Sequence, residues 1–322
     1  MVIRKYLNPK NDVAFKRIFG QEKNRDILLA MLNAVLAKQI HRPLQEVHFV
    51  SPIQEGKTVY QKQSTIDVLC KDEDGCTYII EMQVEKDAEF KERAQFYVSN
   101  AFSNQPQKGD SYKALKKVIF LAFCNYPIFP KKADYKSDHQ IQDIVTQEND
   151  LKKLCFTFVD LSKFKRYETE QVSDLTLENK FYYFLKYAAE ITDNELEALI
   201  KDSPIIDKAF HELVSSYWTS EELREYEDAE KGRMDYYNIM NQRVKEGIEK
   251  GIKKGRKEGI EKGEKRGLRK GRKEGIKKGR EEGKKEREKE IARQMLAKGE
   301  PIEKVSLYTG LSKKEIEDLE KK

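Results

Sequence analysis

The sequence predicts a mixed α/β domain followed by a mainly helical region, and three features of the chain lead to this prediction. A β-hairpin, a nearly continuous apolar run typical of a buried strand, and helical periodicity on either side of them indicate a sheet flanked by helices. From about residue 174 the pattern becomes helical, and a glycine-rich basic repeat follows. At 322 residues, the chain is long enough for one or two domains.

The hairpin is predicted from two strand-like segments that flank a turn. Residues 64–70 and 77–84 have strand-like sequences, and Asp74-Gly75 between them is a strong short-range turn signal. A chain that folds back about positions 73–74 brings residue 67 opposite residue 80 or 81. The two segments are otherwise apolar, so polar side chains among them need an explanation.

Polar side chains converge in this hairpin. Because side chains alternate along a strand, Glu81 and Gln83 share a face, whereas Met82 points away. Together with Asp67 they place two carboxylates and an amide in one small volume. Buried carboxylates without a partner are costly, so this arrangement favours a bound cation, and hard oxygen ligands favour Mg²⁺ or Mn²⁺. The alternative is that these carboxylates simply face water.

Helices and further strands are predicted on both sides of the hairpin in the first domain. The segment Asn11–Gly20 has helical periodicity and a plausible stop at its glycine, and residues 26–38 form a second amphipathic helix. Residues 85–104 are expected to form a helix after the hairpin. The apolar run 117–123 predicts a buried central strand, and residues 156–161 predict another.

The charge of the chain is concentrated in one segment. Residues 246–290 contain 19 Lys and Arg against 11 Asp and Glu, a net charge of +8, whereas the rest of the chain carries a net charge of −2. Any attraction to nucleic acid from bulk charge is therefore expected in this segment.

Composition argues against several other classes of protein. Four cysteines without a C-x-x-C pair and four scattered histidines argue against a zinc site and indicate a reduced, cytoplasmic setting. The chain has no apolar run long enough to span a membrane, and its N-terminus lacks the apolar stretch of a signal peptide. No membrane partner is expected.

The basic segment contains a glycine at every fourth position. Ten glycines run from Gly247 to Gly283, and on a helix of 3.6 residues per turn such a row advances about 40° per step. The row therefore winds around the helix instead of forming one flat seam, and each glycine costs about 1 kcal/mol relative to alanine. Two alternatives remain open, a flexible basic spacer or a long helix that winds around a partner helix, as in a homo-oligomer.

The last segment regains amphipathic character. Residues 291–297 and 301–308 each have apolar positions at helical spacing, and Ser312 is suited to cap a third short helix. Short helices joined by a tight turn that contains glycine resemble a helix-turn-helix. The alternative is a small helical cap or oligomerisation element.

Short motifs over nearly the whole chain occur in the same order in one known family. They are Asn11-Asp12-x-x-Phe15-Lys16-x-x-Phe19-Gly20, Asp67 with Glu81-x-Gln83, Arg93 with Tyr97, Gly109-Asp110-x-Tyr112, Asp160-Leu161-Ser162-Lys163-Phe164, the glycine repeat and Thr309-Gly310-Leu311-Ser312. In this set the chain resembles the Rpn family of recombination-promoting nucleases, also called PD-(D/E)XK nuclease family transposases.

The resemblance implies a domain organisation and an activity. It implies a restriction-endonuclease-like core, a mixed sheet flanked by helices, over residues 1–170. A helical extension over 171–245, the basic glycine repeat over 246–290 and a helix-turn-helix-like tail over 291–322 would follow. It also implies divalent-metal-dependent cleavage of DNA.

The same resemblance assigns the residues of the site. Asp67 and Glu81 would be the metal ligands, and the backbone carbonyl of Met82 would complete the protein ligands of Mg²⁺ or Mn²⁺. Gln83 occupies the position where the wider superfamily keeps a lysine. An amide carries no charge, so Gln83 can only orient water or a phosphate oxygen by hydrogen bonding.

The positive charge that Gln83 lacks is expected from Lys16 or Arg93, or the metal would do more of the work. Asp12 is expected either to reach the metal through a water or to serve as a helix N-cap. Arg93 and Tyr97 lie one helical turn apart, and they would either contact a substrate phosphate or pack beside the hairpin.

The function expected from the sequence is that of a Mg²⁺-dependent DNA endonuclease that hydrolyses phosphodiester bonds and promotes recombination or transposition-like events. The alternative is a catalytically weak protein that binds DNA or assembles through the glycine repeat and the helical tail. A nuclease that acts on RNA is a third possibility.

Overall fold

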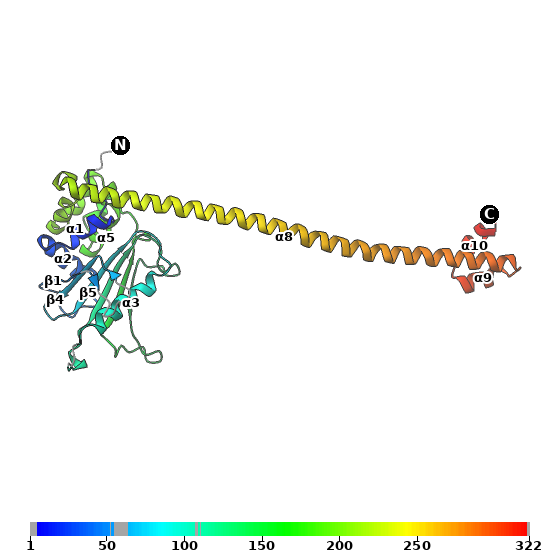
Figure 1. The fold of residues 1–322 in the computed structure, drawn as a ribbon, viewed down its shortest axis with the longest axis horizontal. Coiled ribbons are helices and arrows are strands. Elements are labelled where there is room, and N and C mark those ends of the chain that lie inside the picture. The colour runs from blue at the N-terminus through cyan, green and yellow to red at the C-terminus, as the bar shows by residue number, and fades with distance from the viewer. Residues whose placement is uncertain (1–4, 52, 55–63, 107–108, 110, 321–322) are drawn as a thin grey trace. The chain divides into compact units, whose positions relative to one another are not determined.

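The computed structural model divides the chain into two compact units, Met1–Asp235 and Tyr236–Lys322. The residues that the structure describes are 5–51, 53–54, 64–106, 109 and 111–320 (Figure 1). Asp110, part of a motif named above, lies outside the described residues.

A six-stranded mixed sheet forms the centre of the first unit, with the strand order β1-β4-β5-β6-β8-β7. The strands are β1 (Val47–Phe49), β4 (Val68–Asp72), β5 (Thr77–Gln83), β6 (Val118–Cys124), β7 (Lys136–Gln140) and β8 (Leu154–Asp160), beside a separate pair β2 (Ile53–Gln54) and β3 (Ser64–Thr65). Strands β5, β6 and β8 are parallel, and β1, β4 and β7 each pair antiparallel with a neighbour. The apolar run predicted as a central strand is β6, whose residues are all buried.

Helices cover both faces of this sheet, as the sequence predicts. The α-helices that precede the long helix α8 are α1 (Asp12–Phe19), α2 (Arg25–Val35), α3 (Phe90–Ser103), α4 (Thr169–Val172), α5 (Leu177–Tyr187), α6 (Asp193–Ile200) and α7 (Pro204–His211). Helices α1, α2, α5 and α7 pack in one apolar core with one face, and α3 packs in a second core against the other face (Figure 1). The fold class expected from the sequence is confirmed.

The predicted hairpin forms, with one difference from the expectation. The register Val68↔Ile80 places residue 67 beside residue 81, as the turn signal predicts. The strand expected over residues 64–70 is instead interrupted at Ile66 and Asp67. The interruption lies where the side chains of Asp67 and Glu81 take backbone hydrogen bonds, as described below.

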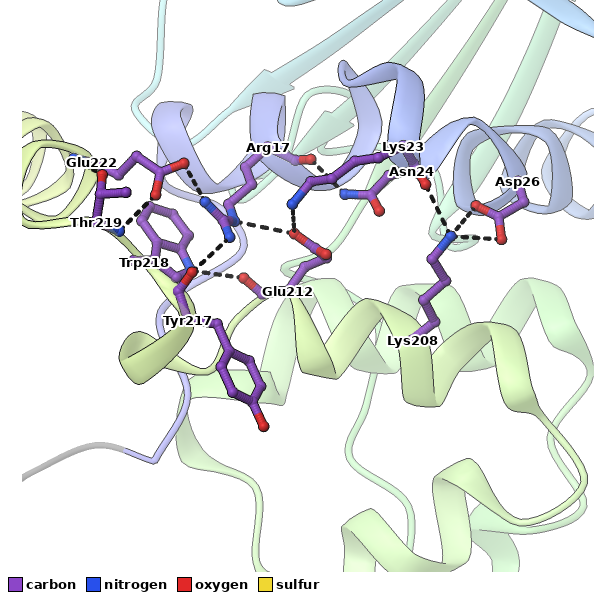
Figure 2. A network of polar contacts seen from close by, with 10 residues as sticks. All are labelled: Arg17, Lys23, Asn24, Asp26, Lys208, Glu212, Tyr217, Trp218, Thr219 and Glu222. Carbon is purple, nitrogen blue, oxygen red and sulfur yellow. Dashed lines mark hydrogen bonds and ion pairs between the residues drawn. The ribbon is translucent and has the colours of Figure 1, made fainter.

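The side chain of Arg17 fastens α1 to the helical extension (Figure 2). Its guanidinium donates to Glu212 Oε2 at 3.1 Å, to the backbone oxygen of Tyr217 at 3.1 Å and to Glu222. It also lies 4.6 Å from the ring centroid of Trp218. Because Arg17 is buried, these contacts compensate its charge and fix the position of α1.

Asn11 fixes the other end of the same helix. Its side-chain oxygen accepts from the backbone of Val13 at 3.0 Å, which makes Asn11 the N-cap of α1. Its side-chain nitrogen donates to the backbone oxygen of Tyr226 at 3.2 Å and to Glu230 Oε1 at 3.0 Å. The first turns of α8 (Ser220–Ala297) therefore hold the start of α1.

The glycine repeat lies within α8 and is helical, whereas the partner helix of the second alternative stays a prediction. A Cβ added at any of the ten glycines from Gly247 to Gly283 would meet no atom within 4 Å among the described residues. Each glycine therefore stands on an open helix surface.

Among the described residues no helix combines the length and the apolar character that a membrane crossing requires.

The tail forms a small helical cluster at the end of α8. Helices α9 (Ile302–Thr309) and α10 (Lys313–Glu320) pack with that end through Ala292, Val305, Leu311 and Ile316. Gly310 joins the two helices with a φ of 73°, the left-handed conformation that glycine adopts without strain. Ser312 and Glu315 form reciprocal capping bonds at the start of α10, as expected.

Candidate active site

Asp67 and Glu81 meet where the ladder between β4 and β5 ends. The backbone nitrogen of Asp67 donates to Glu81 Oε1 at 3.3 Å, and the backbone nitrogen of Met82 donates to Asp67 Oδ2 at 2.8 Å. Beyond Val68 and Ile80, the last pair of the ladder, these backbone N–H groups thus donate to side-chain carboxylates instead of to backbone oxygens. This exchange explains why β4 begins at Val68 and why the two carboxylates are brought together.

Both carboxyl groups are held away from water. The side chain of Asp67 is 14% exposed, and residue Glu81 is 3% exposed. Burial raises the pKa of Asp67 to about 7, although the hydrogen bond from Met82 opposes this. Burial and the neighbouring charge of Asp67 raise the pKa of Glu81 to about 8. Two ionised carboxylates buried side by side repel each other, and a bound cation would stabilise their ionised forms.

Gln83 lies on the same face of β5 as Glu81, as the alternation of side chains predicts, while Met82 packs in the core on the other face. The amide nitrogen of Gln83 donates to Glu81 Oε2 at 3.0 Å, and its amide oxygen accepts from Arg93 at 3.0 Å. Because a guanidinium only donates, the amide oxygen of Gln83 must face Arg93. The orientation of the amide is therefore fixed by chemistry.

Arg93 reaches the site from the first turns of α3. Besides Gln83, its guanidinium binds Asp87 Oδ2 at 2.7 Å and lies 5.2 Å from the ring centroid of Phe90. Its Nε is buried and has no hydrogen-bond partner among the described residues. Arg93 therefore anchors Gln83 and keeps a positive charge beside the carboxylates.

Lys16 reaches the site from α1, on the opposite face of the sheet. Its Nζ lies 2.8 Å from Asp12 Oδ2 and 3.8 Å from Asp67 Oδ1. Burial lowers the pKa of Lys16, but the hydrogen bond to Asp12 and the charges of Asp67 and Glu81 raise it overall. The ammonium group is thus charged and directed at the site.

The structure decides between the alternatives that the sequence left open for Asp12 and for Tyr97. The N-cap alternative for Asp12 is wrong, because Asn11 is the cap and Asp12 is the first residue of α1. Tyr97 is buried and belongs to the core between α3 and the sheet. Burial raises its pKa, and the nearby charge of Glu81 adds to this shift. Of the two alternatives for Tyr97, the structure favours packing beside the hairpin.

The donor atoms of the site fit a hard divalent cation. Within the described part of the chain, no group of three or more His, Cys, Asp or Glu side chains is placed to hold a metal ion. The donors that the structure brings together are the carboxylates of Asp67 and Glu81, both of them oxygen ligands. Such oxygens suit Mg²⁺ or Mn²⁺, and burial raises the pKa of both carboxyl groups even though Lys16 and Arg93 lie nearby.

Asp87 and Arg17 support the site and the helix that carries Lys16, although neither was predicted from the sequence. Asp87 holds Arg93 and also accepts a backbone hydrogen bond from Glu89 at 2.8 Å, which shapes the turn before α3. An Asp two residues before such a turn is a usable signal. Arg17 gave no signal, because its partners lie about 200 residues away in the sequence.

Two protein-family models match the chain. The model described as PD-(D/E)XK nuclease family transposase matches residues 9–243, a range that includes the whole candidate site. The model described as the C-terminal HTH domain of the Rpn/YhgA-like nuclease family matches residues 285–321. No curated protein and no solved structure matches the chain significantly.

Proposed function

Because the chain belongs to the PD-(D/E)XK nuclease family transposases, we propose that it is an endonuclease that hydrolyses phosphodiester bonds within DNA. Its role would be to promote recombination or transposition-like events. The observation that supports this proposal best is the buried pair of Asp67 and Glu81, in which Glu81 accepts a hydrogen bond from the backbone of Asp67. Lys16, Gln83 and Arg93 border the pair.

A divalent cation, Mg²⁺ or Mn²⁺, would be held by Asp67, Glu81 and the backbone carbonyl of Met82. When bound, this cation would polarise the scissile phosphate and lower the pKa of the attacking water. The chain itself would supply position and charge around that phosphate.

Gln83 and Lys16 would together replace the lysine of the wider superfamily, Gln83 by orienting the water and Lys16 by supplying positive charge. Gln83 has one amide hydrogen left after its bond to Glu81, and with it the side chain would orient the attacking water. Arg93 would act as a positioning residue, because it fixes the amide oxygen of Gln83. The ammonium of Lys16, held by Asp12, would stabilise negative charge on the phosphate.

Nicking of supercoiled plasmid DNA by the full chain tests this proposal. We expect nicking with Mg²⁺, none with EDTA, and a loss of at least about 100-fold in rate for Asp67→Ala, since one ligand and one buried charge disappear. Asp74→Ala is the matched control, because Asp74 is an exposed carboxylate of the same hairpin.

Thermal melting followed by circular dichroism would establish that both variants are folded. Metal-dependent nicking that persists in folded Asp67→Ala would refute the assignment of the site.

A second candidate function is a catalytically weak protein that binds DNA through its C-terminal part. The match of residues 285–321 to an HTH domain and the net charge of +8 in residues 246–290 favour it. Calorimetric titration with Mn²⁺ discriminates the two functions. Binding to the wild type but not to Glu81→Ala favours the enzyme, and the absence of binding to both favours the DNA-binding protein.

A further inference from the structure

A groove with a volume of about 280 Å³ lies between the first half of α3 and the strands β7 and β8. Four aromatic rings line it, those of Phe129, His139, Phe156 and Phe158. The centroids of Phe129 and His139 lie 5.0 Å apart at an interplanar angle of 37°, and Phe158 lies 5.3 Å from Phe129 and 5.6 Å from His139 in edge-on geometry. Helix α3 packs mainly over β5 and β6, so this part of the sheet face remains accessible.

The groove carries positive charge and no negative charge. Lys91 lines the groove, and its Nζ lies 6.0 Å from the ring centroid of Phe129; Lys132 is not a lining residue, but its Nζ lies 4.9 Å from the same centroid. The polar side chains that line the groove are Lys91, Gln95, His139 and Gln140, with no carboxylate among the lining residues that the structure describes. Lys132 lies 3.4 Å from the ring nitrogen of His139, and together with burial it lowers the pKa of that histidine. An anionic ligand with a flat apolar part would complement such a surface.

The loop that carries Phe129 is fixed before any ligand arrives. Lys163 Nζ donates to the backbone oxygens of Phe129 at 2.8 Å and of Lys132 at 2.7 Å. Lys163 also pairs with the buried Asp160 at 3.3 Å, at the end of β8. The ring of Phe129 therefore needs little ordering on binding, which favours affinity.

The groove lies close to the candidate active site, with α3 between them. Arg93, which binds Gln83, stacks on Phe90, and the ring centroid of Phe90 lies 6.3 Å from that of Phe158 in the groove wall. Lys91 and Arg93 are two residues apart, so they point to nearly opposite sides of α3. The two sites thus lie on opposite sides of α3, and a helix with its side chains is about 10 Å across. One DNA strand spans that distance in about three nucleotides at 3.4 Å per nucleotide.

We propose that this groove binds an unpaired nucleobase of the DNA strand whose phosphodiester bond lies at Asp67 and Glu81. The base stacks on Phe129, and the adjoining phosphate pairs with Lys91 and Lys132. Aromatic stacking needs an unpaired base, since a base within a duplex already stacks on its neighbours. This proposal rests on the proposed function and specifies its substrate as a strand with at least one unpaired nucleotide near the cleavage point. The two lysines favour a polyanion over an apolar peptide as the occupant.

Fluorescence of a single-stranded oligonucleotide that contains 2-aminopurine tests the proposal on the full chain in EDTA. Stacking on Phe129 should quench the fluorescence, whereas the basic segment 246–290 contains no aromatic residue and gives no such quenching. Phe129→Leu should lose the quenching and bind about tenfold more weakly. The matched control is Phe96→Leu, an exposed aromatic residue of α3 that does not line the groove, and it should behave like the wild type.

A second variant tests the groove without changing Phe129, whose replacement alters the packing of the groove wall. Lys91→Gln removes a surface charge and should weaken binding of the oligonucleotide and reduce its salt dependence. Wild-type quenching and affinity in both folded variants would overturn the proposal, as would equal quenching of the same probe in a fully paired duplex. Because EDTA prevents cleavage, this binding assay is independent of the plasmid assay. Quenching in a chain that does not nick DNA would refute the proposed nuclease function but not the binding of a base in the groove.

Discussion

At the scale of single residues, two cations are candidates to replace the lysine that the wider superfamily keeps at the position of Gln83. Lys16 and Arg93 come from helices on opposite faces of the sheet and place two cations around the buried carboxylates. Arg93 is engaged with Gln83 and Asp87, whereas Lys16 is 38% exposed at its side chain and faces the site. Lys16 is therefore the better candidate for contact with a phosphate.

The buried carboxylates should make the stability of the metal-free protein depend on pH. Their pKa values are raised to about 7 for Asp67 and about 8 for Glu81, so the folded chain holds protons that the unfolded chain loses above about pH 4. Their contribution to stability is full below about pH 4 and is lost as the pH rises through 7 to 8. In EDTA the free energy of unfolding should therefore fall between pH 5 and pH 8.5.

Urea denaturation of the wild type and of Asp67→Asn measures this effect. The variant has one carboxyl group less and a neutral neighbour for Glu81, so its stability should depend less on pH and should exceed that of the wild type at pH 8.5. A gain of about 1 kcal/mol corresponds to a rise of about 2–4 °C in Tm. Asp74→Asn should follow the wild type, and an Asp67→Asn curve parallel to the wild type would contradict the assignment.

At the scale of elements, α1 matters because it carries Lys16 and Asp12 and is held at both ends by the helical extension. Asn11 binds the first turns of α8 at one end, and Arg17 binds Glu212 and Glu222 at the other. The position of Lys16 relative to Asp67 thus depends on contacts outside the sheet.

Arg17→Met should destabilise the protein by about 3 kcal/mol, because it removes the buried guanidinium that Glu212 and Glu222 share and leaves Glu212 with Lys23 as its only cation among the described residues. Arg25→Met is the matched control, since Arg25 pairs with Glu22 at an exposed position and its loss should cost less than about 1 kcal/mol. Urea denaturation at pH 7 compares the two. Equal costs would show that the Arg17 network contributes no more than a surface ion pair.

The long helix α8 is stabilised differently from the helices of the core. Its ten glycines together cost about 10 kcal/mol of helix propensity. Ion pairs one turn apart, such as Lys265 with Glu261 at 2.6 Å, offset part of this cost, at a few tenths of a kcal/mol each. The side chains around the repeat are exposed, so packing within the described chain contributes little there.

At the scale of the whole molecule, affinity for DNA is expected to divide between the basic segment 246–290 and the proposed active site. Residues 246–290 hold a net charge of +8, while the remaining residues sum to −2. Release of counterions from DNA should therefore depend mainly on this segment.

Deletion of residues 246–290 should flatten the dependence of DNA affinity on salt, measured as log K against log salt by fluorescence anisotropy with a duplex. The slope should fall by several units, since each phosphate contact contributes about 0.9. The matched control replaces the ten glycines of the repeat with alanine, which keeps the charge and should keep the slope. An unchanged slope after the deletion would place the DNA contacts elsewhere.

Much of the fold and the centre of the site could be predicted because they follow from local patterns. Alternation of side chains and a turn signal bring Asp67 and Glu81 together, and an unbroken apolar run identifies β6. The strand β7 could not be predicted, because its sequence, Lys-Ser-Asp-His-Gln, has no apolar periodicity and only pairing with β8 makes it a strand. The resemblance drawn from the ordered motifs is confirmed by the two family models.

The sequence by itself determined the family, the mixed sheet and the pairing of the two carboxylates, since these depend on residues close together in the chain or on motifs in a fixed order. Only the tertiary structure decided that Asn11 and Arg17 hold α1 to the helical extension, that Lys16 and Arg93 reach the carboxylates from opposite faces, and that Phe129 and His139 form a groove wall. These arrangements join segments that no local periodicity relates, so they exist only once the helices have packed on the sheet.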